Sequence, residues 1–404
     1  MTSRPFDGVN ILDFTWAATG PHTLSFFAFF GATIIKVESR SRFDSLRVLG
    51  PFKDGIAEPE RSYSFAYSQA GKRLNITLNM SHPKSREVVK KLVQWADIVG
   101  DSYSTGTIER WGLGYEDLKK IKPDIIMLRT CMHGHTGPLA KQHGQGFILT
   151  ALTGVDSLIS WPDRAPSGAY GPFTDYIVPQ LNTITLIAAL DFRRRTGNGQ
   201  YIDQSQHEAT LGLIAPLILD YTVNNRDIIP CGNRLPYAAP HGIYRCLGDE
   251  RWCAIAVFTD EEWVSFCNVI GQPALAEDPR FNTILNRKEN EDKLDEIVES
   301  WTSRHTSEEV MSLLQESGVA AGRVSNAKDM AEDPQFQHYN FFENIEHPVQ
   351  KNIPFSHGPN FRLSNDNYEI GRSTLLGEHN DYVYTNLLGF TDEEFSELIA
   401  EGVI

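Results

Sequence analysis

The chain has 404 residues, 41% of them hydrophobic and 22% charged, a composition typical of an ordered globular protein long enough for more than one domain. Its formal net charge of −15 argues against nucleic acid as a general partner, because binding to phosphates needs a basic surface. The five cysteines include no CxxC pair, and their odd number suits a reducing compartment. We find no signal-peptide core and no apolar run of membrane-spanning length, so we expect a cytoplasmic protein with no membrane partner.

Residues 8–140 alternate between strand-like and helix-like segments. Strands are predicted at Val9–Phe14, Ala32–Glu38, Asn75–Leu78, Asp97–Gly100 and Asp124–Leu128. Helices are predicted around His22–Phe30, over Ser81–Ala96 with Ser81 as its N-cap, and over Tyr115–Ile121. Continuously apolar strands that alternate with helices predict a parallel, doubly wound, Rossmann-like sheet in an α/β domain.

The remaining chain begins with a long apolar helix, Tyr176–Arg195, which should end at Gly197. A second helix is expected from about Gln204 to Tyr221. After Asn225, short β-like runs and a set of amphipathic helices between Asp260 and about Gly318 indicate a smaller α+β domain. Residues 340–370 read as an extended connection, and Asp392–Ala400 reads as a closing helix.

Asp175 stands at the start of the predicted long helix, after a loop with two glycines and a proline. An aspartate at this place is commonly an N-cap, whose carboxylate accepts backbone N–H bonds. A carboxylate can equally be a nucleophile that forms covalent intermediates. The local sequence leaves both interpretations open.

Glycines such as Gly134, Gly144 and Gly146 follow predicted strands, where an open α/β sheet binds its ligands. No dinucleotide-type or P-loop glycine motif stands in the right context, so neither site is supported. Lys36, Lys72, Arg73 and Arg110 can serve a phosphate-bearing ligand or can be ordinary surface charges.

Three histidines, His133, His135 and His143, lie within eleven residues of one another. Their spacing resembles that of metal ligands, but no carboxylate partner is evident in the sequence. We therefore predict no metal site.

Motifs along nearly the whole chain resemble, in order, the class III CoA-transferase family, which includes formyl-CoA and carnitine CoA-transferases. The most diagnostic is DFRRRTGNGQYIDQSQHEA. The others are VNILDFTWAATGPHTLSFFAFFGATIIKVES, GKRLNITLN, WADIVGDSYSTGTIERWGLGYEDLKKIKPDIIM, HGHTGPLAKQHGQGFILTALTGV, GNRLPYAAPHGIYRC, DPRF and LLGEHNDYVYTNLLGF.

The resemblance implies a role for Asp175, because the family's nucleophilic aspartate lies just before the helix that ends in RTGxGQ. Its carboxylate would attack an acyl-CoA donor and then carry CoA as an aspartyl thioester, with mixed anhydrides before and after. An acceptor carboxylic acid would finally take the CoA. Backbone N–H groups of glycine-rich loops would stabilise the oxyanions.

The resemblance also places CoA, which is a substrate here. The matching positions are Trp16, Ala17, Ala18, Lys72, Arg73, Leu74, Ser102, Tyr103, Ser104, Arg110, His143, Gly144, Gln145 and Gly146, with Arg40 one place beyond the arginine of formyl-CoA transferases. The implied fold is a large domain of residues 1–225 completed by 331–404, and a small domain of 226–330. Two such chains would interlock as rings in a dimer.

The sequence departs from the family pattern at Gln145 and Gly146, where many members have a tyrosine or an acidic residue. This change suggests an altered acyl pocket. Racemases of the same fold need a base on each face of the substrate, and their His-Asp pair is missing at these two positions. The alternatives of a racemase and of one subunit in a hetero-oligomer stay open.

The substrate is suggested by two motifs, DFTWAATGP and GNRLPYAAPHGIYRC, which look similar to benzylsuccinate CoA-transferase subunits of anaerobic toluene breakdown. This similarity implies succinyl-CoA as the donor and an aromatic dicarboxylate such as benzylsuccinate as the acceptor. Trp16, Phe147, Tyr170 and Phe173 can line a pocket for a phenyl ring or can belong to the core.

Overall fold

The computed structural model describes residues 4–169, 171–227, 229–355, 358–359, 361–365 and 368–404. The chain divides into two compact units. Unit 1 comprises Met1–Asp156, Gly168–Asp227 and His338–Ile404, and unit 2 comprises Ser157–Ser167 and Ile228–Gln337. Among the described residues, every helix is too short or too polar to cross a membrane.

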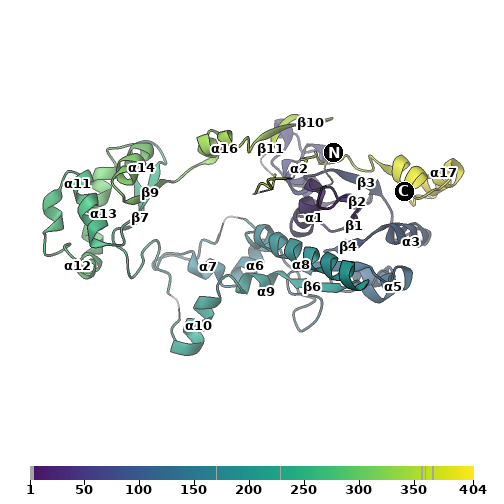
Figure 1. Cartoon of the computed structure of the whole chain (residues 1–404), viewed down its shortest axis with the longest axis horizontal. Coiled ribbons are helices and arrows are strands. Elements are labelled where there is room, and N and C mark those ends of the chain that lie inside the picture. The colour runs from purple at the N-terminus through teal and green to yellow at the C-terminus, as the bar shows by residue number, and fades with distance from the viewer. Residues whose placement is uncertain (1–3, 170, 228, 356–357, 360, 366–367) are drawn as a thin grey trace. The chain divides into compact units, whose positions relative to one another are not determined.

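Unit 1 is built on a six-stranded sheet whose strands all run parallel, in the order β3-β2-β1-β4-β5-β6 (Figure 1). This order is that of the doubly wound dinucleotide-binding fold, so the predicted fold class is confirmed. The strands are β1 (Asn10–Phe14), β2 (Thr33–Glu38), β3 (Arg73–Thr77), β4 (Ile98–Asp101), β5 (Ile126–Cys131) and β6 (Tyr201–Ser205).

Helices cover both faces of this sheet because the strands are apolar on both sides. On one face, Ile11 and Ile98 share a core with Leu24 of α1 (Thr19–Phe29) and Leu186 of α8 (Thr174–Thr196). On the other face, Leu12 and Val99 pack with α3 (Ser85–Trp95) and α5 (Tyr115–Ile121). Neighbouring residues of one strand therefore point into different cores.

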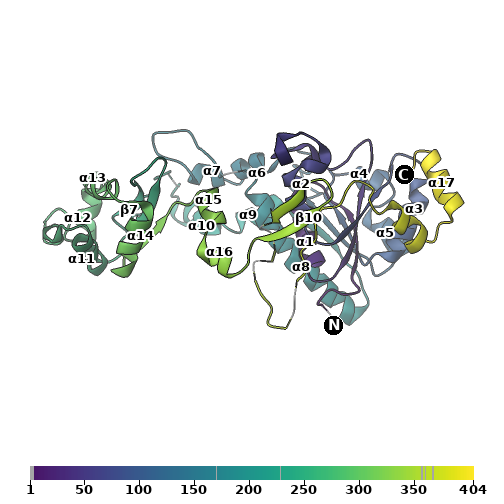
Figure 2. The same cartoon turned by 90° about the horizontal axis from the view of Figure 1, so that it is seen from above.

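The C-terminal segment completes the second of these cores. Figures 1 and 2 both place α17 (Asp392–Ala400) beside α3. Leu398 is buried among the residues of that core, and Lys84 lies 2.9 Å from a carboxylate oxygen of Glu397. The end of the chain is thus part of unit 1.

Two predicted helices differ from the structure. Ser81 is not an N-cap: its N–H donates to the Asn79 side chain in a turn, and α3 begins only at Ser85, after Pro83. The helix expected from Gln204 to Tyr221 is divided into the end of β6, α9 (Gln206–Leu211) and α10 (Ala215–Asn224). Pairing with β5 holds Gln204 in the sheet, and the Ser205 hydroxyl then caps α9.

The segment expected to be an extended connection contains a hairpin of β10 (Glu343–His347) and β11 (Lys351–Phe355). The remaining elements of unit 1 are short and connect the larger ones. They are α2 (Tyr63–Ser68), α4 (Thr107–Arg110), α6 (Gly146–Leu152), the π-helix Tyr382–Leu387 and the 3-10 turns Ser45–Val48, Lys53–Gly55 and Pro59–Arg61. The short helices α7 (Val155–Leu158) and α16 (Pro334–His338) lie where the chain passes between the units.

Unit 2 is an antiparallel sheet of β7 (His241–Arg245), β8 (Trp252–Ala256) and β9 (Ala320–Arg323), with helices packed on one face. Its core contains Ile255, Trp263 and Leu294. The helices are α11 (Asp260–Val269), α12 (Ile284–Glu289), α13 (Glu291–Thr302), α14 (Ser307–Glu316) and α15 (Ala327–Ala331), with a 3-10 turn at Pro273–Ala276. This unit has its own apolar core, as the α+β pattern predicts.

Candidate active site

The strand order reverses between β1 and β4, and the carboxyl ends of these two strands form the crevice where such sheets bind ligands. Trp16 follows β1, and its backbone N–H donates to Oγ of Ser102 at 2.7 Å, just after β4. The ring of Tyr103 lies 5.6 Å from the Trp16 ring. The indole Nε1 of Trp16 is buried and bonds to no described residue. A buried donor of this kind points to an acceptor on a ligand.

Buried charged side chains support the loop after β1. Ala17 has a positive φ of 59°, and its N–H donates to Oδ1 of Asp44 at 3.2 Å. Lys36 lies 3.4 Å from Oδ2 of Asp44 and also donates to the backbone oxygen of Thr15. Lys36 is therefore an internal support of this loop rather than a surface cation.

The three candidates at the start of β3 have different environments. Arg73 is buried, lies 3.0 Å from Oδ2 of Asp13 and donates at 2.7 Å to the backbone oxygen of Pro21. Its guanidinium thus fastens α1 to the sheet. Leu74 packs against the core, whereas the Lys72 side chain is 76% exposed. Of this trio, Lys72 is the cation that solvent can reach.

The polar candidates after Tyr103 lie on α4 and in the turn before it. Arg110 donates to Oγ1 of Thr107 at 3.0 Å, and Oγ of Ser104 lies 3.4 Å from the same hydroxyl. Arg40 is exposed on the loop after β2. Arg42, which the sequence did not single out, lies with its guanidinium carbon 5.7 Å from the centre of the Trp16 ring.

Asp175 lies in the first turn of α8, and α8 has no side-chain cap among the described residues. Its carboxylate instead faces α1, where Oγ1 of Thr19 donates to Oδ1 at 2.8 Å. Nε2 of Gln206 donates in turn to Oγ1 of Thr19, also at 2.8 Å. Burial raises the pKa of Asp175 to about 6, and the bond from Thr19 acts in the opposite direction. The sequence analysis did not single out Thr19 or Gln206, although both lie in motifs that carry the family resemblance.

Gly146 begins α6 and lies against the other carboxylate oxygen of Asp175. A Cβ added to Gly146 would lie 3.0 Å from Oδ2 of Asp175 and 2.2 Å from Cβ of Pro172. Only a residue without a side chain fits here. His143, Gly144 and Gln145 are exposed on the preceding loop. Of that group, the structure brings Gly146 to the carboxylate.

Two of the three candidate histidines, His133 and His135, have partners within the protein. Nδ1 of His133 lies 3.1 Å from Nδ1 of His207, and His135 lies 3.0 Å from Asp203. Burial raises the pKa of Cys131, which is 3.6 Å from His135, to about 11, so this thiol is protonated at neutral pH. Within the described part of the chain, no three potential ligands are grouped to hold a metal ion.

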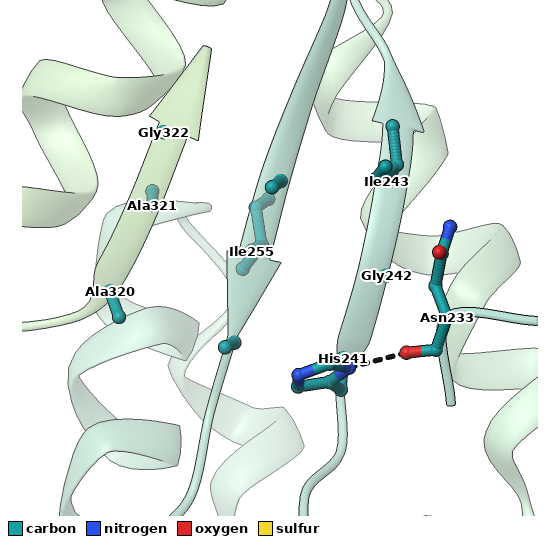
Figure 3. A pocket seen from close by; sticks show the side chains of 10 residues that line it. Asn233, His241, Gly242, Ile243, Ile255, Ala320, Ala321 and Gly322 are labelled. Carbon is teal, nitrogen blue, oxygen red and sulfur yellow. Dashed lines mark hydrogen bonds between the residues drawn. The ribbon is translucent and has the colours of Figure 1, made fainter. Parts of the chain in front are cut away.

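Unit 2 has a shallow hollow on the open face of its sheet (Figure 3). Aliphatic side chains and glycines line most of it, and Nδ1 of His241 bonds to the backbone oxygen of Asn233. No carboxylate, thiol or hydroxyl belongs to its lining. This hollow therefore offers no candidate nucleophile.

The sequence profile of CoA-transferase family III matches residues 6–380. The chain belongs to this family. A CoA-transferase of family III acts on CoA thioesters, so the recognition from sequence and the prediction of an enzyme are both confirmed.

Relatives within the family match almost the whole chain. Succinyl-CoA–D-citramalate CoA-transferase of Chloroflexus aurantiacus is 32% identical over 408 residues, which cover 99% of this chain and 98% of that protein. The β subunit of succinyl-CoA–L-malate CoA-transferase from the same organism is 28% identical over 417 residues, 100% of this chain and 99% of the subunit. The crystal structure of a CaiB/BaiF family protein from Brucella suis superposes with a TM-score of 0.86 at 28% identity, covering 96% of this chain and all of that one.

Proposed function

We propose that this enzyme transfers CoA from succinyl-CoA to a dicarboxylic acid through covalent intermediates on Asp175. The observation that carries the proposal is the geometry of this carboxylate. One oxygen accepts a bond from Thr19, while the other lies beside Gly146 and accepts no hydrogen bond from a described residue. The raised pKa of about 6 leaves the group ionised at neutral pH and more basic than an ordinary aspartate.

The chemistry would proceed in four balanced steps. A carboxylate oxygen of Asp175 bonds to the donor acyl carbon, and the C–S bond breaks to release CoA thiolate. The thiolate attacks Cγ of Asp175, and the donor acid leaves with the bridging oxygen. The acceptor carboxylate then attacks Cγ and expels the thiolate, which finally attacks the acceptor acyl carbon and frees Asp175. The thioester energy is retained at every step as long as water stays out.

CoA would lie at the carboxyl ends of β1 and β4. Trp16 and Tyr103 offer aromatic surface there, and the buried Nε1 of Trp16 offers a donor. Among the exposed cations, Arg42, Lys72 and Arg110 are suited to the phosphates. Arg73 would act indirectly, since its bonds to Asp13 and Pro21 hold α1 in place.

Two classes of acid are candidates for the acceptor, small hydroxy-dicarboxylates and aromatic dicarboxylates. The relatives named for D-citramalate and L-malate favour a small hydroxy-dicarboxylate. Benzylsuccinate is the aromatic alternative, for which the half-buried Trp16 and the exposed Phe147 and Phe173 offer ring contacts. Tyr170, the fourth aromatic candidate, lies outside the described residues. Exchange assays with these three acids and labelled succinyl-CoA would decide between them.

The enzyme would work as an assembly, either an interlocked homodimer or a hetero-oligomer with a related chain. In α10 no residue is buried, and Leu219 and Val223 are 60% and 76% exposed. Ile184 of α8 is 64% exposed. A helix of ten residues with no buried face needs a partner to be stable.

The test of the covalent role is to trap the intermediate. Incubation with succinyl-CoA followed by borohydride or hydroxylamine should modify the peptide that contains Asp175, as mass spectrometry would show. Asp175→Ala should lose both the modification and turnover but still bind CoA, whereas Asp163→Ala, which changes an exposed aspartate, should keep all three. A modified peptide elsewhere would refute the proposal. Deuterium uptake at the acyl α-carbon without an acceptor acid would instead indicate a racemase.

A further inference from the structure

Three side chains from three helices form a chain of hydrogen bonds that ends on the proposed nucleophile. Gln206 of α9 donates to Thr19 of α1, which donates to Oδ1 of Asp175 in α8. Thr19 is 4% exposed and Gln206 is 8% exposed, so water cannot readily replace either of them. The contacts connect parts of the sequence that are far apart.

The direction of these bonds follows from the number of protons. A threonine hydroxyl has a single proton, and a carboxylate can only accept. Because the Gln206 amide already donates to Thr19, the one proton of the hydroxyl is left for Asp175. Gln206 thereby makes Thr19 a dedicated donor to Oδ1.

The two oxygens of Asp175 are therefore not equivalent. Oδ1 accepts the hydrogen bond from Thr19, whereas Oδ2 lies beside Gly146 and accepts no hydrogen bond from a described residue. Rotation about the last bond of an aspartate is soft and close to two-fold, so a carboxylate that nothing held would exchange its oxygens between turnovers. The bond from Thr19 opposes this exchange.

On the basis of the covalent role proposed for Asp175, we propose that Thr19 and Gln206 are positioning residues that select Oδ2 as the oxygen that reacts. In each turnover Oδ2 bonds to the donor acyl carbon and leaves with the donor acid. The oxygen that replaces it comes from the acceptor carboxylate, whose C–O bond breaks when CoA takes the acceptor acyl group. Oδ1 would stay on Asp175 throughout.

This retention can be measured with isotopes. The enzyme is incubated for many turnovers with succinyl-CoA and succinate that carries ¹³C and ¹⁸O, and the Asp175 peptide is then analysed by mass spectrometry. Appearance of ¹³C in succinyl-CoA reports turnover. The wild-type peptide should gain one ¹⁸O atom and no more. Thr19→Val, which removes the hydroxyl at nearly constant volume, should gain two, and Thr19→Ser should again gain one.

The same variants have a second readout. Without the bond from Thr19 the pKa of Asp175 should rise. In Thr19→Val the rate should therefore begin to fall at a pH roughly one unit higher than in the wild type. Gln206→Leu should show the same changes to a smaller extent, and it replaces Thr19→Val as the test if that variant does not fold.

Each outcome is decisive. Two ¹⁸O atoms in the wild type, or one in a Thr19→Val enzyme that turns over, would overturn the positioning role. Turnover without any ¹⁸O on Asp175 would overturn the covalent role on which the inference rests. Absence of ¹³C exchange would overturn succinyl-CoA as the donor.

Discussion

A Cβ atom added to Gly146 would lie 3.0 Å from Oδ2 of Asp175, so the residue that opens α6 faces the proposed nucleophile directly. The added atom would also lie 2.2 Å from Cβ of Pro172, in the loop that leads into α8. Any side chain at position 146 must move this loop or the carboxylate.

We therefore expect Gly146→Ala to lower kcat by about a hundredfold, because a shift of about 1 Å in a reacting group has an effect of that order. CoA binding should change little, and steady-state kinetics with isothermal titration would separate the two effects. Gly322→Ala is the matched control, since a Cβ at that position would meet no atom within 4 Å. An unchanged kcat in Gly146→Ala would show that the catalytic position of the Asp175 carboxylate does not depend on Gly146.

The pH dependence of the rate should report the ionisation of Asp175. Burial raises its pKa to about 6, and only the ionised carboxylate is a nucleophile. We expect kcat/KM to fall about tenfold for each pH unit below about pH 6. A rate that stays constant down to about pH 4.5, close to the pKa of an ordinary aspartate, would contradict a buried nucleophile.

The raised pKa of Asp175 should also make the stability of the folded protein depend on pH. A carboxyl whose pKa is higher in the folded state than in the unfolded state binds more protons when folded. Its contribution to the free energy of unfolding therefore falls as the pH rises from the unfolded-state pKa to the folded-state pKa. Asp175→Asn should thus melt at a higher temperature than the wild type above about pH 6, with the difference vanishing near pH 4. Thermal melts across this range would test the sign. Asp163→Asn, at an exposed position, should show no such trend.

The bond between Trp16 and Ser102 connects the two strand ends at the proposed CoA site. Ser102→Ala would leave the Trp16 N–H without its acceptor, at a cost of about 1–3 kcal/mol. We expect the affinity for CoA to fall about tenfold, measured by isothermal titration, while labelling of Asp175 at saturating succinyl-CoA persists. Ser303→Ala, on an exposed position of unit 2, serves as the control. Unchanged affinity for CoA would place its binding elsewhere.

The exposed apolar side chains of α10 test the proposed assembly. Val223→Glu places a charge where an apolar contact with a second chain is expected, and it should shift the particle mass measured by light scattering towards the monomer. Lys90→Glu, a charge change on an exposed residue of α3, should leave the mass unchanged. An unaltered assembly in Val223→Glu would exclude α10 from the interface.

Some elements were predictable because their signals are local. Tyr115–Ile121 and Asp392–Ala400 are helices over the predicted residues, and the second begins at a capping box formed by Thr391 and Glu394. β6 was missed because Tyr201–Ser205 (YIDQS) has two apolar residues followed by three polar ones, without the pattern of a buried strand, and lies at the edge of the sheet. Pairing with β5 decides its conformation, and such pairing leaves no mark in a short window of sequence.

The sequence by itself determined the family and the parallel sheet, because the family motifs and the apolar periodicity are local features of the chain. It also led to the proposal that Asp175 is the nucleophile. Only the tertiary structure decided how that aspartate is held. Thr19 bonds to it from 156 residues away along the chain, and Gln206, 31 residues away, bonds to Thr19. Gly146 lies beside its other oxygen. Contacts of this kind depend on how α1, α6, α8 and α9 pack, which is a property of the folded chain and not of any segment of it.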